Sequence, residues 1–203
     1  MDNYNIFIPS LQKKFLFKSL SIKQYKKILF SNNSNDFLNI NFNLFFIEAI
    51  KENCLDNISL TDFDKHIIAY QLYSYSFEKE IKKEIIIEHP TVNIVHSDEL
   101  YHLECRVPSV DQEIEYSQYA LKKNKNDAEE LLLAEITKYV CLLKINETNI
   151  DLNVDIEKKI KIIKNLPVHI LAQCINYIDS VKGKIKDFYK DREFNYNAIS
   201  LIP

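Results

Sequence analysis

The sequence predicts an α+β fold that is mainly helical, in which an N-terminal β-hairpin, helices, a small central antiparallel sheet and a C-terminal helical part follow one another. Two kinds of pattern support this fold class. Short β-favouring runs occur at the start and in the middle of the chain, and segments with apolar residues three and four positions apart surround the middle runs. Capping residues at the starts of several helical segments agree with the same division.

The start of the chain predicts two short strands. Residues 4–8 (YNIFI) lead into Pro9 and Ser10, and residues 14–17 (KFLF) follow after a polar turn. Phe15 and Phe17 are two positions apart, so they share one face of a strand. We therefore expect an N-terminal hairpin.

Capping patterns predict the first helices. Ser21 and Gln24 match a capping box, in which the hydroxyl accepts from a free helix N–H and the amide reaches back. Thr61 and Asp64 form a similar arrangement. Residues 31–36 (SNNSND) read as a loop. Helices are expected at about 22–30, 41–54 and 62–77.

The middle of the chain, residues 83–121, changes character. It contains the runs EIIIEH, VNIVH, YHLECRV and EIEYSQYAL, separated by Pro- and Ser-containing breaks. Such runs are typical of three or four strands in a small antiparallel sheet.

The remainder of the chain returns to helical spacing. After a polar link, helices are expected at 127–143, at 155–164 and from 167 to about Gly183. The chain thus divides into residues 1–82, a hairpin with helices, 83–121, a β segment, and 122–203, a helical part. The alternative is one compact domain with a β insertion.

A single glycine, Gly183, excludes several function classes. The G-x-G-x-x-G turn and the P-loop bring backbone close to phosphate, which requires residues without a Cβ. The G-x-S-x-G nucleophile elbow has the same requirement. We therefore expect no glycine-rich phosphate-binding loop and no nucleophile elbow. For the chain as a whole we expect no cofactor and no small-molecule substrate.

Charge and hydropathy limit the expected partners. The formal net charge is −3, whereas nucleic-acid binders usually carry a basic excess. The lysine clusters at 122–125 and 158–164 are balanced by acidic residues, so they read as solvated surfaces. No long uncharged apolar stretch and no signal-peptide pattern appears, so the sequence predicts an intracellular protein without a membrane span.

Histidine and cysteine residues suggest a metal site as an alternative. His89, His96, His102 and Cys105 lie close together in the sequence, and His102 and Cys105 have H-x-x-C spacing. Structural zinc sites usually have two closely spaced ligand pairs, which this group lacks. We therefore predict polar positions on a half-solvated sheet and no metal.

Other reactive groups also have a structural interpretation. Cys54, Cys141 and Cys174 fall on apolar stripes of expected helices, where a thiol packs as a small hydrophobe. The pairs Asp62/Asp64 and Glu129/Glu130 lie at expected helix starts, where carboxylates complement the helix dipole. No catalytic residue is assigned.

Aromatic residues are dense in the first quarter of the chain. We expect most of them to pack in the core. A short N-terminal hairpin would also leave a strand edge open to pairing with another polypeptide. The residues concerned are Phe7, Phe15, Phe17, Phe37, Phe42, Phe45 and Phe46.

Three segments together resemble a known family. They are FIPSLQKKFLFKSLSIKQYKKIL, IKENCLDNISLTDFDKHIIAYQLYSYSFEKEI and IIKNLPVHILAQCINYI, with a β segment between the second and the third. In this order they resemble the baseplate hub assembly proteins of T-even-like contractile-tailed phages.

The resemblance implies a non-enzymatic morphogenesis factor. Such a protein would act in the host cytoplasm as a chaperone or adaptor, and its partners would be other hub and tail proteins. It could also persist in the virion baseplate as a minor structural component. The alternative function from the residues alone is a small metal-dependent enzyme that uses His96, His102 and Cys105.

Overall fold

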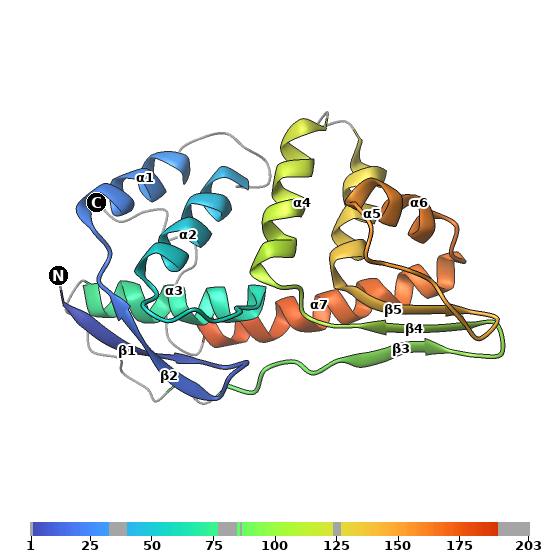
Figure 1. Ribbon diagram of the computed structural model, residues 1–203, viewed down its shortest axis with the longest axis horizontal. Helices are drawn as coiled ribbons and strands as arrows, with labels where there is room; N and C mark the ends of the chain where they lie inside the picture. The colour runs from blue at the N-terminus through green and yellow to red at the C-terminus, as the bar shows by residue number, and fades with distance from the viewer. Residues whose placement is uncertain (1, 33–39, 77–84, 86, 124–126, 191–203) are drawn as a thin grey trace. The chain divides into compact units, whose positions relative to one another are not determined.

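A computed structural model describes residues 2–32, 40–76, 85, 87–123 and 127–190 of the chain (Figure 1). The fold is α+β, as the sequence predicts, with seven helices and two antiparallel sheets in these residues. Two compact units can be distinguished, Met1–His89 with Lys184–Pro203, and Pro90–Gly183. Each unit is described separately below.

The first unit begins with the predicted hairpin. Strands β1 (Asn3–Ile8) and β2 (Lys13–Lys18) are antiparallel. Tyr4 pairs with Phe17 and Ile6 with Phe15, so these four apolar residues share one face. Phe17 is fully buried on that face. The hairpin is therefore anchored in the core of this unit through a single face.

Three helices complete the described part of this unit: α1 (Ile22–Asn32), α2 (Ile40–Asn53) and α3 (Asp62–Ser76). Helices α1 and α2 pack together, and α3 packs against β1. The capping box before α1 is confirmed, because Ser21 Oγ accepts from the Gln24 N–H at 3.2 Å and Gln24 Oε1 accepts from the Ser21 N–H at 2.9 Å. Of the loop expected at 31–36, residues 31 and 32 belong to α1, and 33–36 lie outside the described residues.

The second unit contains a four-stranded antiparallel sheet in the order β3-β4-β5-β6 (Figure 1). The strands are β3 (Asn93–Ser97), β4 (Tyr101–Cys105), β5 (Val140–Ile145) and β6 (Thr148–Asn149). The β3–β4 register shifts between Ile94 and His96, which is the signature of a β-bulge.

The turn between β5 and β6 has an unusual backbone. Asn146 and Glu147 have φ values of 48° and 63°. Positive φ at both central residues of a two-residue hairpin loop defines a type I′ turn, in which glycine is usually favoured. In this chain Asn and Glu take that conformation instead.

Four helices accompany the sheet: α4 (Val110–Lys122), α5 (Ala128–Tyr139), α6 (Ile156–Lys164) and α7 (Val168–Lys190). Helix α5 contacts both α4 and α6. Helix α7 reaches the sheet, since Gln173 Oε1 lies 2.8 Å from Nδ1 of His96 on β3. The Tyr177 ring also meets that of Tyr139 at the end of α5, and the Tyr177 hydroxyl donates to the carbonyl of Thr91, before β3, at 3.1 Å. The core of the unit includes the buried residues Leu103, Ile136, Leu143, Ile163 and Ile170.

Several expected elements were wrong. The run EIEYSQYAL is part of α4 and not a strand, because Ser109 and Gln112 form a capping box that starts a helix. The helix expected at 127–143 ends at Tyr139, and its last residues form β5. The final helix passes Gly183 and continues to Lys190. In EIIIEH, positions 85 and 87–89 have no strand, and 84 and 86 lie outside the described residues.

No helix in the described parts of the chain combines the length and apolar character that crossing a membrane requires.

Candidate functional site

The β3–β4 hairpin gathers polar side chains on both faces of the sheet. Leu103 and Cys105 of β4 are fully buried, so they define the inner face. His102 and Glu104 alternate with them and therefore point to the outer face. The two faces carry separate hydrogen-bonded clusters.

The outer-face cluster is a line of three side chains. His102 Nδ1 lies 3.2 Å from Ser97 Oγ, and His102 Nε2 lies 3.0 Å from Glu104 Oε1. The order Ser, His, carboxylate is that of a hydrolase triad, and nothing in the linear sequence signalled it. Such chemistry also requires oxyanion donors and exclusion of water. Ser97 is exposed, and a quarter of the His102 side chain is exposed, so the line is a polar network on a solvated surface.

The inner-face cluster centres on His96. Its Nδ1 lies 2.8 Å from Gln173 Oε1 of α7, and its Nε2 lies 2.8 Å from Asp98 Oδ2. The ring of His169, also on α7, approaches the His96 ring edge-to-face at 5.4 Å. His96 therefore ties the strand to the helix.

Asp98 organises the turn of the same hairpin. Its Oδ1 accepts from the N–H groups of Leu100 at 2.8 Å and Tyr101 at 2.6 Å. The hydrogen bond from the Tyr101 backbone, followed by that from His96, lowers the pKa of Asp98 to about 2. The carboxylate is thus charged at neutral pH and fixes the turn.

The three residues of the metal hypothesis do not converge. His96 is opposite Leu103 and belongs to the inner face, whereas His102 belongs to the outer face. Cys105, on β4, is fully buried on the inner face, and His89 is in the other unit, 3.0 Å from Thr61 Oγ1. Within the described residues, no three His, Cys, Asp or Glu side chains are arranged to hold a metal ion.

The cysteines are free thiols, buried at Cys105 and Cys174 and partly exposed at Cys54 and Cys141. Cys174 is buried on α7, as expected, but Cys54 follows the end of α2 and Cys141 lies on β5. A hydrogen bond with Cys174, together with burial, raises the pKa of Cys105. Burial raises the pKa of Cys54 and Cys141. A raised pKa keeps these three thiols protonated, which disfavours nucleophilic chemistry. The hydrogen bond with Cys105 lowers the pKa of Cys174, but that thiol is fully buried.

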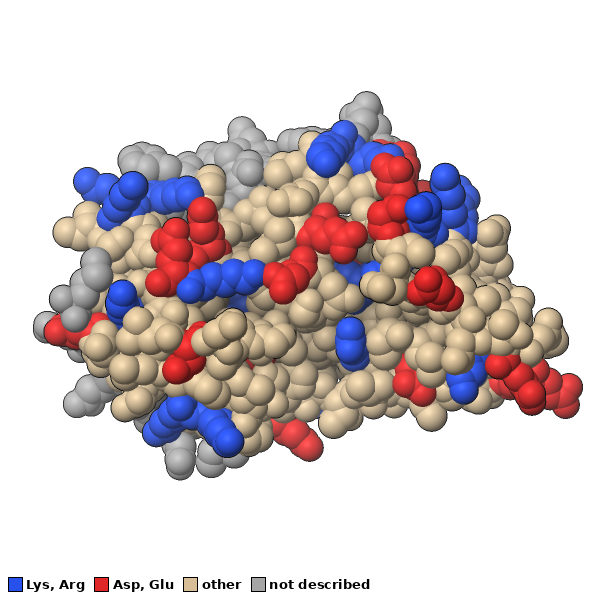
Figure 2. Space-filling view, in the orientation of Figure 1, with Lys and Arg blue, Asp and Glu red and all other residues tan. Residues whose placement is uncertain are grey.

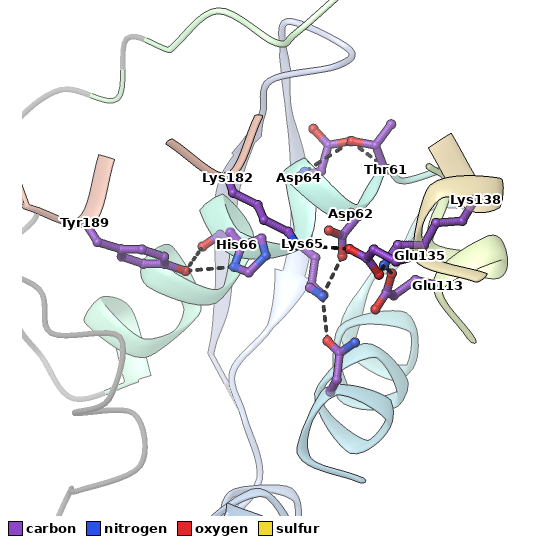
Figure 3. A network of polar contacts seen from close by, with 11 residues as sticks. Thr61, Asp62, Asp64, Lys65, His66, Glu113, Glu135, Lys138, Lys182 and Tyr189 are labelled. Carbon is purple, nitrogen blue, oxygen red and sulfur yellow. Dashed lines mark hydrogen bonds and ion pairs between the residues drawn. The ribbon is translucent and has the colours of Figure 1, made fainter. Parts of the chain in front are cut away.

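The second unit also contains a buried ion cluster, which the sequence did not predict (Figure 3). Lys138 Nζ lies 2.5 Å from Glu113 Oε2 and 2.8 Å from Glu135 Oε2, and Lys182 Nζ lies 3.1 Å from Glu135 Oε1. Lys138 also lies 4.3 Å from the centre of the Tyr116 ring. The cluster joins α4, α5 and α7, and its carboxylates are paired with cations, so it reads as structural.

The acidic pairs at helix starts have structural partners. Asp64 is fully buried, and its carboxylate accepts from Thr61 and from both the N–H and the hydroxyl of Ser10, at 2.6–2.9 Å. Asp62 pairs with Lys65 at 2.6 Å. These contacts cap α3 and fix the hairpin turn to it.

Glu129 and Glu130, at the start of α5, also pair with cations. Glu129 lies 3.1 Å from Lys164 and Glu130 lies 2.8 Å from Lys123. Figure 2 shows that basic and acidic side chains are interspersed on the face in view. The exposed ion pairs are expected to contribute little to stability.

The aromatic residues of the first quarter pack largely as expected. Phe17 and Phe46 are buried. Phe7, Phe15 and Phe45 are partly buried, and Lys27 lies 4.2 Å from the centre of the Phe45 ring. Phe37 lies outside the described residues, as does the side chain of Phe42.

The N-terminal hairpin, for which an open edge was expected, has contacts along part of each edge. Beside β1, the Phe7 N–H donates to Gln71 Oε1, and Gln71 Nε2 donates to the Phe7 carbonyl. Beside β2, the Leu55 N–H donates to the Leu16 carbonyl at 3.1 Å. Both edges of this hairpin are therefore partly covered by the protein itself.

Strand β3 also has an unpaired edge. This strand pairs with β4 alone, and no other strand in the described residues adjoins it. Val92 and Ile94 are 54% and 57% exposed along this edge. Exposed apolar residues are ordinary on protein surfaces, but on an unpaired edge they form a template for another strand.

Comparisons with models of protein families, with curated proteins and with solved structures find no significant match.

Proposed function

We propose that this protein acts by contact with other polypeptides, as an assembly factor for the baseplate hub of a contractile phage tail. The observation that carries the mode of action is the unpaired β3 edge with exposed Val92 and Ile94. The assignment to a tail baseplate rests on the resemblance of three sequence segments to hub assembly proteins.

The candidate reactive groups support a binding role over a catalytic one. His102 belongs to the polar network with Ser97 and Glu104 on the solvated outer face. His96 connects β3 to α7, and Cys105 is a buried thiol. Each of these side chains is engaged in contacts within the fold. Under this proposal the partners are hub and tail proteins, met in the host cytoplasm.

Coexpression with the baseplate hub proteins of a T-even-like phage tests the proposal. We expect a soluble complex that contains this chain, and lower yields of soluble hub protein without it. If the hub proteins fold and assemble equally well in its absence, the proposal is wrong. Mass spectrometry of mature virions then separates a transient chaperone, which is absent, from a retained minor component.

A further inference from the structure

We propose that the outer edge of β3 accepts a short extended segment of a partner protein, with alternating apolar and Lys or Arg side chains, as an added antiparallel strand. This inference rests on the proposed function, because it names the contact surface and the chemistry of the partner. The argument has three parts: the edge, its side chains and its charge.

The edge is suited to strand addition because its usual protections are few. Natural edge strands are commonly guarded by Lys, Pro or a covering segment. The edges of the N-terminal hairpin have such covers in Gln71 and in the segment at Leu55. Strand β3 contains neither Lys nor Pro. Among the described residues, the bulge between Ile94 and His96 interrupts this edge, and the Tyr177 hydroxyl takes up the Thr91 carbonyl just before β3. The bulge limits the regular stretch and favours a short partner segment.

The side chains supply an apolar contact. Val92 and Ile94 are two positions apart, so they project on the same side of an extended backbone. Both are more than half exposed. A partner strand that places an apolar residue beside each of them would bury β-branched surface while its backbone pairs with β3.

The charge favours a basic partner. Residues 90–105 contain Asp98, Glu99 and Glu104 and no Lys or Arg. Asp98 and Glu99 are exposed directly after β3, and Asp98 is ionised at neutral pH. Opposite charges on paired strands are stabilising, and like charges are not. Lys or Arg in the added segment would therefore find carboxylates at the turn end of the edge.

A second copy of this chain is a less suitable occupant. Antiparallel pairing of β3 with itself about Val95 would place Asp98 opposite Val92 and Glu99 opposite Thr91. Neither carboxylate would gain a cation. Lys or Arg side chains of a basic segment could pair with both carboxylates. The observations therefore favour a different polypeptide as the partner.

Synthetic peptides test the inference on the full-length protein. The probe is the capped peptide KVKVTVK, with two controls: EVEVTVE, and KVKVTVK with alternate backbone amides N-methylated to prevent strand pairing. We expect the basic peptide to shift the NMR amide signals of residues 92–97 and to bind more weakly as salt rises. Equal binding of the acidic or the N-methylated peptide would overturn the proposal.

Two substitutions locate the site. Ile94→Lys, at an exposed position, should weaken binding by about tenfold or more, because it adds a typical edge guard and repels a basic strand. Val168→Lys is the matched control: Val168 is 81% exposed at the start of α7, and its replacement should leave binding unchanged. A dimer of the free protein that Ile94→Lys dissociates would instead identify a second copy as the occupant and overturn the proposal.

The two levels of proposal can fail separately. If hub proteins form a complex with this chain that Ile94→Lys does not weaken, the assembly function stands and the β3 site is wrong. If KVKVTVK binds at β3 but no hub complex forms, the strand-accepting edge stands and the assembly function is wrong.

Discussion

The side-chain amide of Gln71 pairs with the backbone of Phe7 as a neighbouring strand would. Its Oε1 accepts from the Phe7 N–H and its Nε2 donates to the Phe7 carbonyl, each at 2.8 Å. Gln71 is almost fully buried on α3. Gln71 thus satisfies the N–H and the carbonyl of Phe7 on the edge of β1, and it joins the hairpin to α3.

Removing this amide should destabilise the protein. Gln71→Ala leaves the Phe7 N–H and carbonyl without these partners, and we expect the free energy of unfolding to fall by about 1–3 kcal/mol. Urea unfolding followed by circular dichroism measures the change. Gln118→Ala, at an exposed position on α4, is the control and should change stability by less than about 0.5 kcal/mol. Equal effects of the two substitutions would contradict the role of Gln71.

The buried Lys138 should contribute much more to the free energy of unfolding than the exposed Lys164 does. Lys138→Met leaves the carboxylates of Glu113 and Glu135 without their shared cation, and we expect a loss of about 3–5 kcal/mol. Lys164→Met removes an exposed pair with Glu129 and should cost no more than about 1 kcal/mol. Urea unfolding measures both. If Lys138→Met lowers the free energy of unfolding no more than Lys164→Met does, the interpretation of the buried cluster is wrong.

The same cluster should make stability depend on pH. Burial raises the pKa of Glu135, but the ammonium groups of Lys138 and Lys182 outweigh it and hold the pKa below the ordinary 4.5. A folded-state pKa below the unfolded value contributes stability that is present above about pH 4.5 and is lost as the pH falls through the folded-state pKa. Urea unfolding from pH 7 to pH 3 should show this loss. Glu135→Gln should be less stable at pH 7 and less sensitive to acid; an unchanged acid dependence would refute the assignment.

The β5–β6 turn should be improved by glycine. Glu147 has a φ of 63°, which costs a residue with a Cβ about 1 kcal/mol or more, and Asn-Gly is the favoured type I′ pair. We expect Glu147→Gly to raise the free energy of unfolding by about 0.5–1 kcal/mol. Thr148→Gly, at the next residue, lies in a strand and should lower it. A destabilising Glu147→Gly would show that the side chain is needed there.

Thiol labelling should separate the cysteines into two classes. Cys105 and Cys174 are fully buried, whereas Cys54 and Cys141 are partly exposed. With Ellman's reagent we expect Cys54 and Cys141 to react in the native protein, slowly because burial raises the pKa of both thiols. Cys105 and Cys174 should react only on unfolding. Fast labelling of Cys105 would contradict its burial on the inner face of the sheet.

The sequence was sufficient where local chemistry determines the structure. The capping residues Ser21 and Thr61 precede α1 and α3 as predicted. Each hydroxyl accepts from the N–H group three residues later, and this contact forms in almost any tertiary context. The alternation in residues 14–17 likewise located β2. These signals involve only neighbouring residues.

The errors in predicted secondary structure arose where the hydrophobic pattern of a segment is compatible with both a helix and a strand. EIEYSQYAL alternates like a strand, but Ser109 caps a helix on which Val110, Glu113 and Ser117 share a buried face. Val140–Ile145 is apolar enough to extend α5, and only the pairing with β4 makes it a strand. Tertiary context decided both cases.

The candidate site depended on information that the linear sequence lacks. The alignment of Ser97 with His102 requires the β3–β4 register and its bulge. The cover over β1 comes from Gln71, 64 positions away from Phe7. The sequence therefore offers no means of comparing the edges of the two hairpins, since long-range contacts decide which positions of a strand edge are covered.

Hydrogen–deuterium exchange on the complex purified from coexpression with baseplate hub proteins tests the central claim most directly. The account predicts that amides of residues 92–97 exchange more slowly in the complex than in the free chain, and that Ile94→Lys removes this protection. Unchanged exchange at β3 in a stable complex would contradict it.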